Sequence, residues 1–253
     1  MQAKKAAIAN SKGGVGKTTT VVTLGHALAL RGKRTLVVDF DPQGQCATAL
    51  GLNPEPCVFN LLISPSGGSP HQWVRDTGRE NLDLIPGDRS TATAQIVLNA
   101  ENRSISAVSD ALVSLSKEYD YILFDTAPSA GGLQERAIWA SNLVIIPAAT
   151  EFLSIDGIRQ MAQLLADLTN QRAWQGTLLG VLPTFYDTVT KHSRVAMQSL
   201  KGTFGERLLA PIRRSTILRE CAADGQTIWE KDPDCSVAAD YTCLVNILMK
   251  ERR

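Results

Sequence analysis

The sequence predicts a doubly wound α/β fold, in which a mostly parallel sheet is flanked by helices. Short β-branched or aliphatic runs alternate with amphipathic helical patterns along the chain, and this order is typical of a parallel sheet with helices on both faces. Runs such as Leu143–Pro147 are apolar without alternation, as strands buried on both faces should be. A Gly-rich segment follows the first such run, so the fold is predicted to begin as a strand, a glycine loop and a helix.

Glycine and proline mark where several of these elements end. Gly32 closes the first helix, and Pro86-Gly87 ends one of the strands, because both residue types interrupt regular structure. Helices are expected over Lys17–Arg31, Ser104–Lys117 and Ile155–Thr169. Strands are expected over Ala6–Asn10, Thr35–Asp39, Leu82–Ile85, Tyr121–Asp125, Leu143–Pro147 and Leu178–Leu182.

The chain is long enough for one large domain, and we expect residues 1–253 to form a single domain. The stretch Ser64–Pro70, SPSGGSP, is linker-like, but its shortness favours a surface loop over a domain boundary. The first strand starts almost at the N-terminus. We therefore expect no room for an appended helix-turn-helix domain.

Charge and cysteine content argue against several classes of protein. The net charge of +1 gives no global bias toward nucleic acid, so any such surface must be a local patch. The five cysteines lack C-x-x-C spacing, which argues against a disulfide framework or a zinc knuckle and favours reduced thiols. The N-terminus lacks the apolar core of a signal peptide, and no apolar run approaches the length of a membrane span. We therefore expect a cytoplasmic protein.

The segment K-G-G-V-G-K-T-T, Lys12–Thr19, is a candidate phosphate-binding loop. It departs from the pattern G-x-x-x-x-G-K-[ST] at one point, because Ser11 stands where the first glycine is usual. Its glycines let backbone N–H groups point at phosphate oxygens, and the following helix directs its positive end at the same anion. Lys17 is expected on the β- and γ-phosphates of ATP, and the Thr18 hydroxyl on Mg²⁺. A Gly-rich turn with incidental lysines is the alternative, and the predicted strand before it and helix after it argue against that reading.

Three carboxylates follow predicted strands. Asp125 ends Tyr121–Phe124, whereas Asp39 and Asp41 follow Leu36–Val38 in the segment DFDPQG. Because ligands of open α/β sheets bind beyond the carboxyl ends of the strands, all three are expected near the triphosphate. Asp125 has the form of a Walker-B aspartate, which holds magnesium through water. Any one of them could instead be a cap or turn residue.

The segments KGGVGKTT, DFDPQG, FDTAPS and IPAATEFLSIDG together resemble the deviant Walker-A ATPases of the ParA/MinD group. The similarity is greatest to the small ParA-type partition ATPases, and it runs from Ala6 into the C-terminal helix. It implies a homodimer that sandwiches two ATP molecules, with Lys12 reaching the partner's phosphates. It also implies that Asp41 positions the attacking water and that Asp39 supports Thr18 and the magnesium shell. The catalytic set is then Lys12, Lys17 and Asp41, and the metal set is Thr18, Asp39 and Asp125.

The same resemblance suggests the remaining nucleotide contacts. The triphosphate would lie on Gly13, Gly14, Val15, Gly16, Lys17, Thr18 and Thr19, with Thr19 at the α-phosphate. The adenine contacts would be Pro183, Thr184, Pro211, Ile212 and Arg213. Three segments depart from the sequence motifs that are usual in the family. DTAPSAG stands in place of DCPPSLG, APIRR stands in place of IPRN, and Cys221–Cys235 lacks the SHGKP-type pattern. Adenine and DNA contacts could therefore differ, and the chain could belong to a divergent subgroup with its own cargo.

A ParA-like ATPase would hold DNA without sequence preference and would be nucleoid-associated, with a ParB-like partner that stimulates its slow hydrolysis. Non-specific binding needs phosphate contacts and no base readout. The alternative for the basic residues is an ordinary solvated face. The cargo, whether plasmid, chromosome origin or protein assembly, stays open. Seven basic residues between positions 191 and 219 are the candidate footprint: Lys191, Arg194, Lys201, Arg207, Arg213, Arg214 and Arg219.

Two other outputs are possible within the wider group. A MinD-like protein would bind membranes reversibly through a C-terminal amphipathic helix, and such a stripe exists here. Its charge gathers at the tail end rather than along a polar face, which favours packing on the sheet over membrane binding. The related iron–sulfur carriers require paired cysteines, and the five cysteines here do not have that spacing. The apolar stripe consists of Val237, Ala238, Tyr241, Leu244, Val245, Leu248 and Met249.

Overall fold

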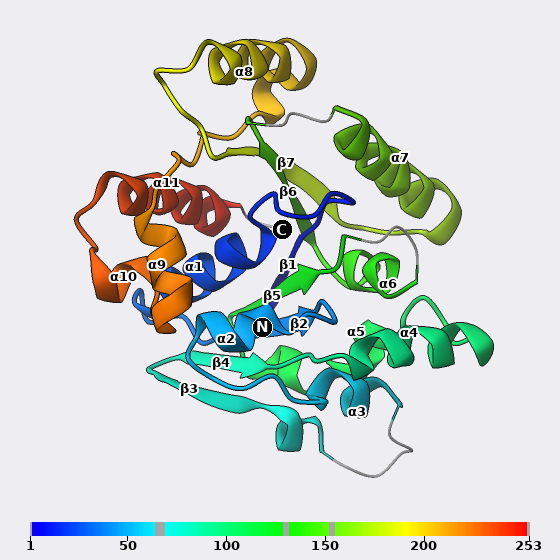
Figure 1. Cartoon of the computed structure of the whole chain (residues 1–253). Helices are drawn as coiled ribbons and strands as arrows, with labels where there is room; N and C mark the ends of the chain where they lie inside the picture. The colour runs from blue at the N-terminus through cyan, green and yellow to red at the C-terminus, as the bar shows by residue number, and fades with distance from the viewer. Residues whose placement is uncertain (1, 64–68, 129–131, 152–154, 252–253) are drawn as a thin grey trace.

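The computed structural model describes residues 2–63, 69–128, 132–151 and 155–251. They form a seven-stranded sheet of order β3-β4-β2-β5-β1-β6-β7, with helices on both faces (Figure 1). Every neighbouring pair is parallel except β3 and β4, which confirms the predicted fold class. The strands are β1 (Lys4–Ile8), β2 (Thr35–Phe40), β3 (Arg75–Arg79), β4 (Leu82–Ile85), β5 (Tyr121–Thr126), β6 (Leu143–Ala149) and β7 (Thr177–Thr184).

The two faces of the sheet bury separate apolar cores. Along β1, Ala6 and Ile8 join one core, whereas Ala7 joins the other, because successive side chains of a strand point to opposite faces. All six residues of β2 and of β5 are buried. Neither face of these strands is exposed to solvent, which explains the uninterrupted apolar runs in the sequence.

Helices from distant parts of the chain cover each face (Figure 1). Buried residues of α1 and α11 pack in the core that contains Ile8, and those of α3 to α7 pack in the core that contains Ala7. The first group is α1 (Lys17–Ala29), α2 (Gln45–Ala49), α9 (Ile217–Asp224), α10 (Ile228–Lys231) and α11 (Ser236–Lys250). The second group is α3 (Cys57–Ile63), α4 (Ser90–Ala100), α5 (Ala107–Ala111), α6 (Leu133–Trp139) and α7 (Ile155–Arg172).

One helix lies apart from both layers. In Figure 1, α8 (Lys191–Phe204) lies beyond the β7 edge of the sheet. Its residue Leu200 is buried in the core that contains Ala7, so the helix is anchored by its inner face. Three short 3₁₀ helices complete the described elements: η1 (Pro70–Trp73), η2 (Leu115–Lys117) and η3 (Gly205–Arg207).

The prediction of one helix over Ser104–Lys117 is wrong. The structure has α5 and η2 there, joined by a turn in which the Leu112 N–H is shared between the carbonyls of Val108 and Ser109. Serine hydroxyls bind the backbone nearby: the Ser104 Oγ accepts from the Ser106 N–H at 3.2 Å, and the Ser116 Oγ donates to the Leu112 carbonyl at 2.7 Å. Such local bonds compete with a regular helix. Of the predicted loop Ser64–Pro70, residues 64–68 lie outside the described residues, and Ser69 caps η1.

The C-terminal stripe packs inside the protein. Val237, Ala238, Leu244, Val245 and Leu248 are buried, as the core-packing interpretation of this helix expects. Tyr241 is buried as well, and Met249 is half-buried. Among the described helices, none is both long and apolar enough to cross a bilayer.

Candidate nucleotide-binding site

The loop between β1 and α1 has the conformation that its glycines predict. Gly14 has φ +71° and Gly16 has φ +86°, a left-handed region in which a Cβ atom clashes with the backbone. Helix α1 begins at Lys17, directly after Gly16. The free N–H groups of its first turn therefore face the loop, where an anion would be held by them and by the helix dipole.

Lys17 is folded into this loop. Its side chain is almost fully buried, at 6% exposure, and Nζ donates to the Lys12 carbonyl at 3.0 Å. Burial lowers the pKa of Lys17, while the charges of Asp125 and Asp41 raise it. An ammonium kept at the centre of a loop of N–H donors is suited to bind phosphate oxygens.

Asp39 and Asp125 lie opposite each other on the adjacent strands β2 and β5, and both are fully buried. The Thr18 hydroxyl donates to Asp125 Oδ2 at 2.6 Å. Asp39 instead accepts the backbone N–H groups of Asp41 and Cys46, each at 3.0 Å. The hydroxyl expected to be supported by Asp39 thus contacts Asp125, whereas Asp39 anchors the loop that carries Asp41.

The buried carboxylates are electrostatically unfavourable without a cation. Burial raises the pKa of Asp125 to about 6, although hydrogen bonds from Thr18 and Cys46 oppose this. Burial, followed by the charge of Asp125, raises the pKa of Asp39 well above its usual value. The Oδ1 atom of Asp125 is buried without a hydrogen-bond partner among the described residues. A hydrated divalent cation beside Thr18 would satisfy that oxygen, so these residues fit Mg²⁺.

A cavity of about 540 Å³ lies in front of the loop. Asp41 and Gln43 reach it from the segment after β2, Pro128 from the segment after β5, and Phe185 from the end of β7. Asp41 is half-buried, and its Oδ1 accepts the Gln43 N–H at 2.9 Å. The loop residues Gly13, Gly14, Gly16, Lys17, Thr18 and Thr19 line the same cavity. The structure thus brings together the predicted phosphate residues and Asp41.

Lys12, which is expected to reach the partner's phosphates, directly precedes the glycines that line the cavity. Lys12 is half-buried, and its backbone N–H donates to the Oδ1 atom of buried Asn10 at 2.9 Å. The neighbouring Ser11 Oγ lies 3.3 Å from the Gly157 carbonyl, which places the loop against the start of α7. Asn10 also donates to the Pro147 carbonyl at 2.7 Å. Its role as an anchor of the loop has no sequence signal, because a single asparagine after a strand is common.

The two predicted adenine segments lie side by side. The Ile212 N–H donates to the Pro183 carbonyl at 2.8 Å, and the Tyr186 N–H donates to the Ile212 carbonyl at 3.1 Å. Pro183, Thr184 and Ile212 are buried, and the Thr184 hydroxyl donates to the Val15 carbonyl of the phosphate loop at 2.9 Å. The residue of this region that lines the cavity is Phe185, a non-glycine with φ +54°, which the sequence reasoning missed.

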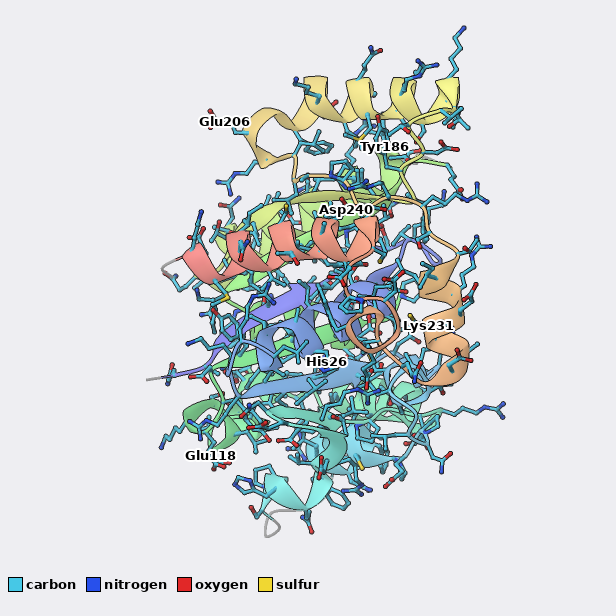
Figure 2. All side chains as sticks on the ribbon, turned by 90° about the vertical axis from the view of Figure 1, so that its left-hand side faces the viewer. His26, Glu118, Tyr186, Glu206, Lys231 and Asp240 are labelled. Atoms are coloured by element: carbon cyan, nitrogen blue, oxygen red, sulfur yellow. The ribbon has the colours of Figure 1, made fainter. Side chains whose placement is uncertain are left out.

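The predicted DNA-binding residues differ in their exposure and in the partners that they contact. Arg213 forms a bidentate ion pair with Asp240, at 2.6 Å and 2.9 Å, and Arg214 lies 2.7 Å from Glu151. Arg207 donates to the Leu178 carbonyl. Lys191, Arg194 and Lys201 are exposed on α8, which forms one end of the molecule (Figure 2). Arg219 lies on α9, and in Figure 1 α11 lies between α8 and α9.

The strand–loop–helix unit with two aspartates at neighbouring strand ends defines the chain as a P-loop nucleotide-binding protein. A family model described as "AAA domain" matches residues 3–175. The chain is 35% identical to the sporulation initiation inhibitor protein Soj of Bacillus subtilis, over 93% of this chain and 94% of that protein. It is 32% identical to the chromosome partitioning protein ParA of Caulobacter vibrioides, over 98% and 94%. The chain therefore belongs to the ParA/Soj family of ATPases.

Solved structures of similar fold cover nearly the whole chain. Cobyrinic acid a,c-diamide synthase from Mycobacterium smegmatis, with a bound ATP analogue and magnesium, is similar with a TM-score of 0.85 and 30% identity. That match covers 98% of this chain and 95% of the other. Apo McdA from Cyanothece has a TM-score of 0.87 over 97% and 99%, and at 24% identity it supports the fold alone.

Proposed function

We propose that this protein is an ATP-driven, dimerising ATPase that holds DNA without sequence preference and positions a cargo on it. The observation that carries the proposal is the contact between the Thr18 hydroxyl and Asp125 beneath the glycine loop. It joins the phosphate-binding and magnesium-binding elements of a P-loop ATPase. The similarity to the chromosome partitioning protein ParA of Caulobacter vibrioides supports the positioning role.

ATP and Mg²⁺ are the proposed ligands. The loop amides and Lys17 would bind the triphosphate, and Thr18 with Asp125 would hold the cation, supported by Asp39. Magnesium supplies positive charge that neutralises the phosphate oxygens as the bond to the leaving group breaks. Phe185, beside the two segments with buried Pro183 and Ile212, is placed to contact the nucleoside.

Hydrolysis is proposed to depend on dimerisation. Lys12 would reach the phosphates bound by a second copy, and a cation supplied in this way stabilises charge on the transferred phosphoryl. Asp41, which lines the cavity, would hold the attacking water. Because the complete site then needs two chains, the isolated protein should hydrolyse ATP slowly.

The Lys12→Ala variant tests this arrangement. We expect it to bind ATP but to lose ATP-dependent dimerisation, and to lose hydrolysis by about a hundredfold or more. Sedimentation and phosphate release measure the two effects, and Lys117→Ala, an exposed lysine of η2, is the control. Dimerisation and turnover equal to those of the control would refute the two-chain site.

DNA binding is proposed to start from α8. Its exposed Lys191, Arg194 and Lys201 can contact phosphates, which gives affinity without sequence readout. Arg213 and Arg214 would join only after leaving their ion pairs. ATP-loaded protein should bind arbitrary duplex DNA, with an affinity that falls steeply with salt. Equal binding by ATP-loaded and ADP-loaded protein would refute this part of the proposal, and with it the expected nucleoid association.

A ParB-like, DNA-binding partner is proposed to stimulate hydrolysis, with a plasmid or chromosome as cargo. A protein assembly is the alternative cargo. A purified stimulating partner that binds DNA would support the DNA cargo, whereas one that stimulates turnover without binding DNA would support the assembly. For the MinD-like alternative, removal of Val245–Arg253 is decisive. A membrane tail would leave a folded ATPase, whereas loss of buried Val245 and Leu248 should unfold the protein at lower denaturant concentration.

A further inference from the structure

Two arginines of the candidate DNA footprint are held by carboxylates from distant parts of the chain. Arg213 forms its bidentate ion pair with Asp240 of α11, a side chain that is only 11% exposed, and its backbone N–H donates to the same carboxylate at 3.0 Å. Arg214 lies 2.7 Å from Glu151, which follows β6. Both arginine side chains stay about half exposed. They therefore lie at the surface, but a carboxylate already neutralises the charge of each.

The two ion pairs are connected to one short segment, Phe185 and Tyr186, directly after β7. On one side of it, the Arg214 N–H donates to the Tyr186 carbonyl at 3.0 Å. On the other side, the hydroxyl of fully buried Thr150, the residue before Glu151, lies 3.1 Å from the Phe185 carbonyl. Because buried backbone groups keep their hydrogen-bond partners, a shift of this segment acts on both ion pairs.

The same segment forms part of the nucleotide cavity. Phe185 lines that cavity, and its ring lies 3.7 Å from the place that a Cβ atom on Gly16 of the phosphate loop would take. Phe185 has φ +54°, a region that residues with a Cβ atom rarely occupy. Backbone in such a conformation is found at ligand clamps and switch regions. A ligand in the cavity thus meets a strained segment whose neighbours hold the two arginines.

We propose that these two ion pairs mask Arg213 and Arg214 from DNA phosphates in the nucleotide-free protein, and that a nucleotide in contact with Phe185 releases them. A bidentate pair with a carboxylate engages the same guanidinium edge that binds a phosphate. Release exchanges each carboxylate for a phosphate of the duplex, which adds affinity without base readout. The release step rests on the proposed function, whereas the masking is tested without nucleotide.

Asp240→Asn is the first test of the masking. Asparagine keeps an oxygen that can accept the Arg213 N–H, but it removes the charge that holds the guanidinium. At low salt, the nucleotide-free variant should bind an arbitrary duplex roughly tenfold more tightly than the wild type. The slope of log K against log salt concentration should also steepen by about one, for one added phosphate contact.

Glu206→Gln is the matched control. It removes the same charge from an exposed carboxylate of η3, which directly follows α8 (Figure 2). A gain from general electrostatics would therefore appear in this variant as well, whereas loss of a mask would not. A gain in Asp240→Asn no larger than that of Glu206→Gln, or an unchanged salt slope, overturns the masking.

A second change shows whether the gain acts through the arginine. Arg213→Gln added to Asp240→Asn should abolish the gain, whereas alone it should alter nucleotide-free binding little, because the arginine is masked there. A gain that survives Arg213→Gln overturns the masking. Glu151→Gln, on a separate element, should give a gain of the same kind through Arg214, and it replaces Asp240→Asn if that variant does not fold.

The release step is measured with saturating Mg²⁺–ATP in the same assay. The factor by which ATP raises DNA affinity should be smaller in Asp240→Asn than in the wild type, by about the gain seen without nucleotide, because the two effects are linked. An equal factor in both proteins would refute release by the nucleotide. If ATP binds but leaves the DNA affinity of the wild type unchanged, the proposed function is refuted, whereas the comparison of the nucleotide-free proteins still decides the masking.

Discussion

Replacing Asp125 by asparagine is expected to stabilise the nucleotide-free protein at neutral pH while it removes magnesium-dependent hydrolysis. Burial raises the pKa of Asp125 from 3.8 to about 6. The folded protein therefore holds this proton more tightly than the unfolded chain does. The contribution of this proton to the free energy of unfolding is fully present at low pH. It is lost as the pH rises through the interval between the two pKa values.

The structure sets the size of the effect. The comparison is with low pH, where Asp125 is protonated in both the folded and the unfolded protein. Relative to that state, a gap of about two pKa units lowers the free energy of unfolding by about 3 kcal/mol above pH 7 and by about 1 kcal/mol near pH 4.5. Asparagine removes the charge, but its amide fits the hydrogen bonds of Thr18 and Cys46 less well, at a cost of about 1 kcal/mol. The net gain in the free energy of unfolding should be about 2 kcal/mol at about pH 7.5 and close to zero at about pH 4.5.

Urea unfolding of the nucleotide-free, chelator-treated protein at the two pH values measures this difference. Asp234→Asn, at an exposed carboxylate, should leave stability unchanged at both. If Asp125→Asn were no more stable than the wild-type protein at neutral pH, or gained equally at both pH values, the electrostatic account of the buried aspartates would be wrong.

Three further changes test other parts of the site. Asp41→Ala should trap an ATP-bound dimer and slow turnover at least about tenfold; turnover near wild type would show that another residue holds the water. Gly16→Ala, at φ +86°, should lower the free energy of unfolding by about 1–2 kcal/mol and abolish ATP binding. The control Gly202→Ala, with open space around it, should leave the free energy of unfolding unchanged. Thr184→Val removes the hydrogen bond to the Val15 carbonyl and should weaken ATP binding several-fold. Thr203→Val is the control, and equal ATP affinities of the two variants would exclude a role of Thr184 in anchoring the phosphate loop.

The sheet and the phosphate loop were predictable because their signals are local. A buried parallel strand such as β5 is a continuous apolar run, and the loop needs glycines at fixed positions, as Gly14 and Gly16 show. The break between α5 and η2 was not predictable from apolar spacing, because serine hydroxyls that bind the backbone decide it. Periodicity does not register that competition.

The parts of the site that depend on contacts between residues far apart in the chain could not be predicted from the sequence either. Nothing in the text DFDPQGQC shows that Cys46 lies against Asp125, 79 positions away. The direct contact of the Thr18 hydroxyl with Asp125 was not foreseen either, since the register of β2 against β5 decides which carboxylate meets the hydroxyl. Arg213 and Arg214 belong to the candidate DNA footprint, and nothing in the sequence shows that they form ion pairs with Asp240 and Glu151 in the fold.

Another molecule could extend the sheet only by pairing with the strand at one of its two edges, and both edges are protected against this. Beside β7, the segment after η3 already pairs with the strand, through Leu209 N–H to the Val181 carbonyl and Ile212 N–H to the Pro183 carbonyl. At the opposite edge, β3 is short, carries charged side chains and is irregular between Asp76 and Arg79. Both features discourage strand addition and the aggregation that follows from it. Within the described part of the chain, neither edge therefore offers another molecule a free, regular strand on which the sheet could be extended.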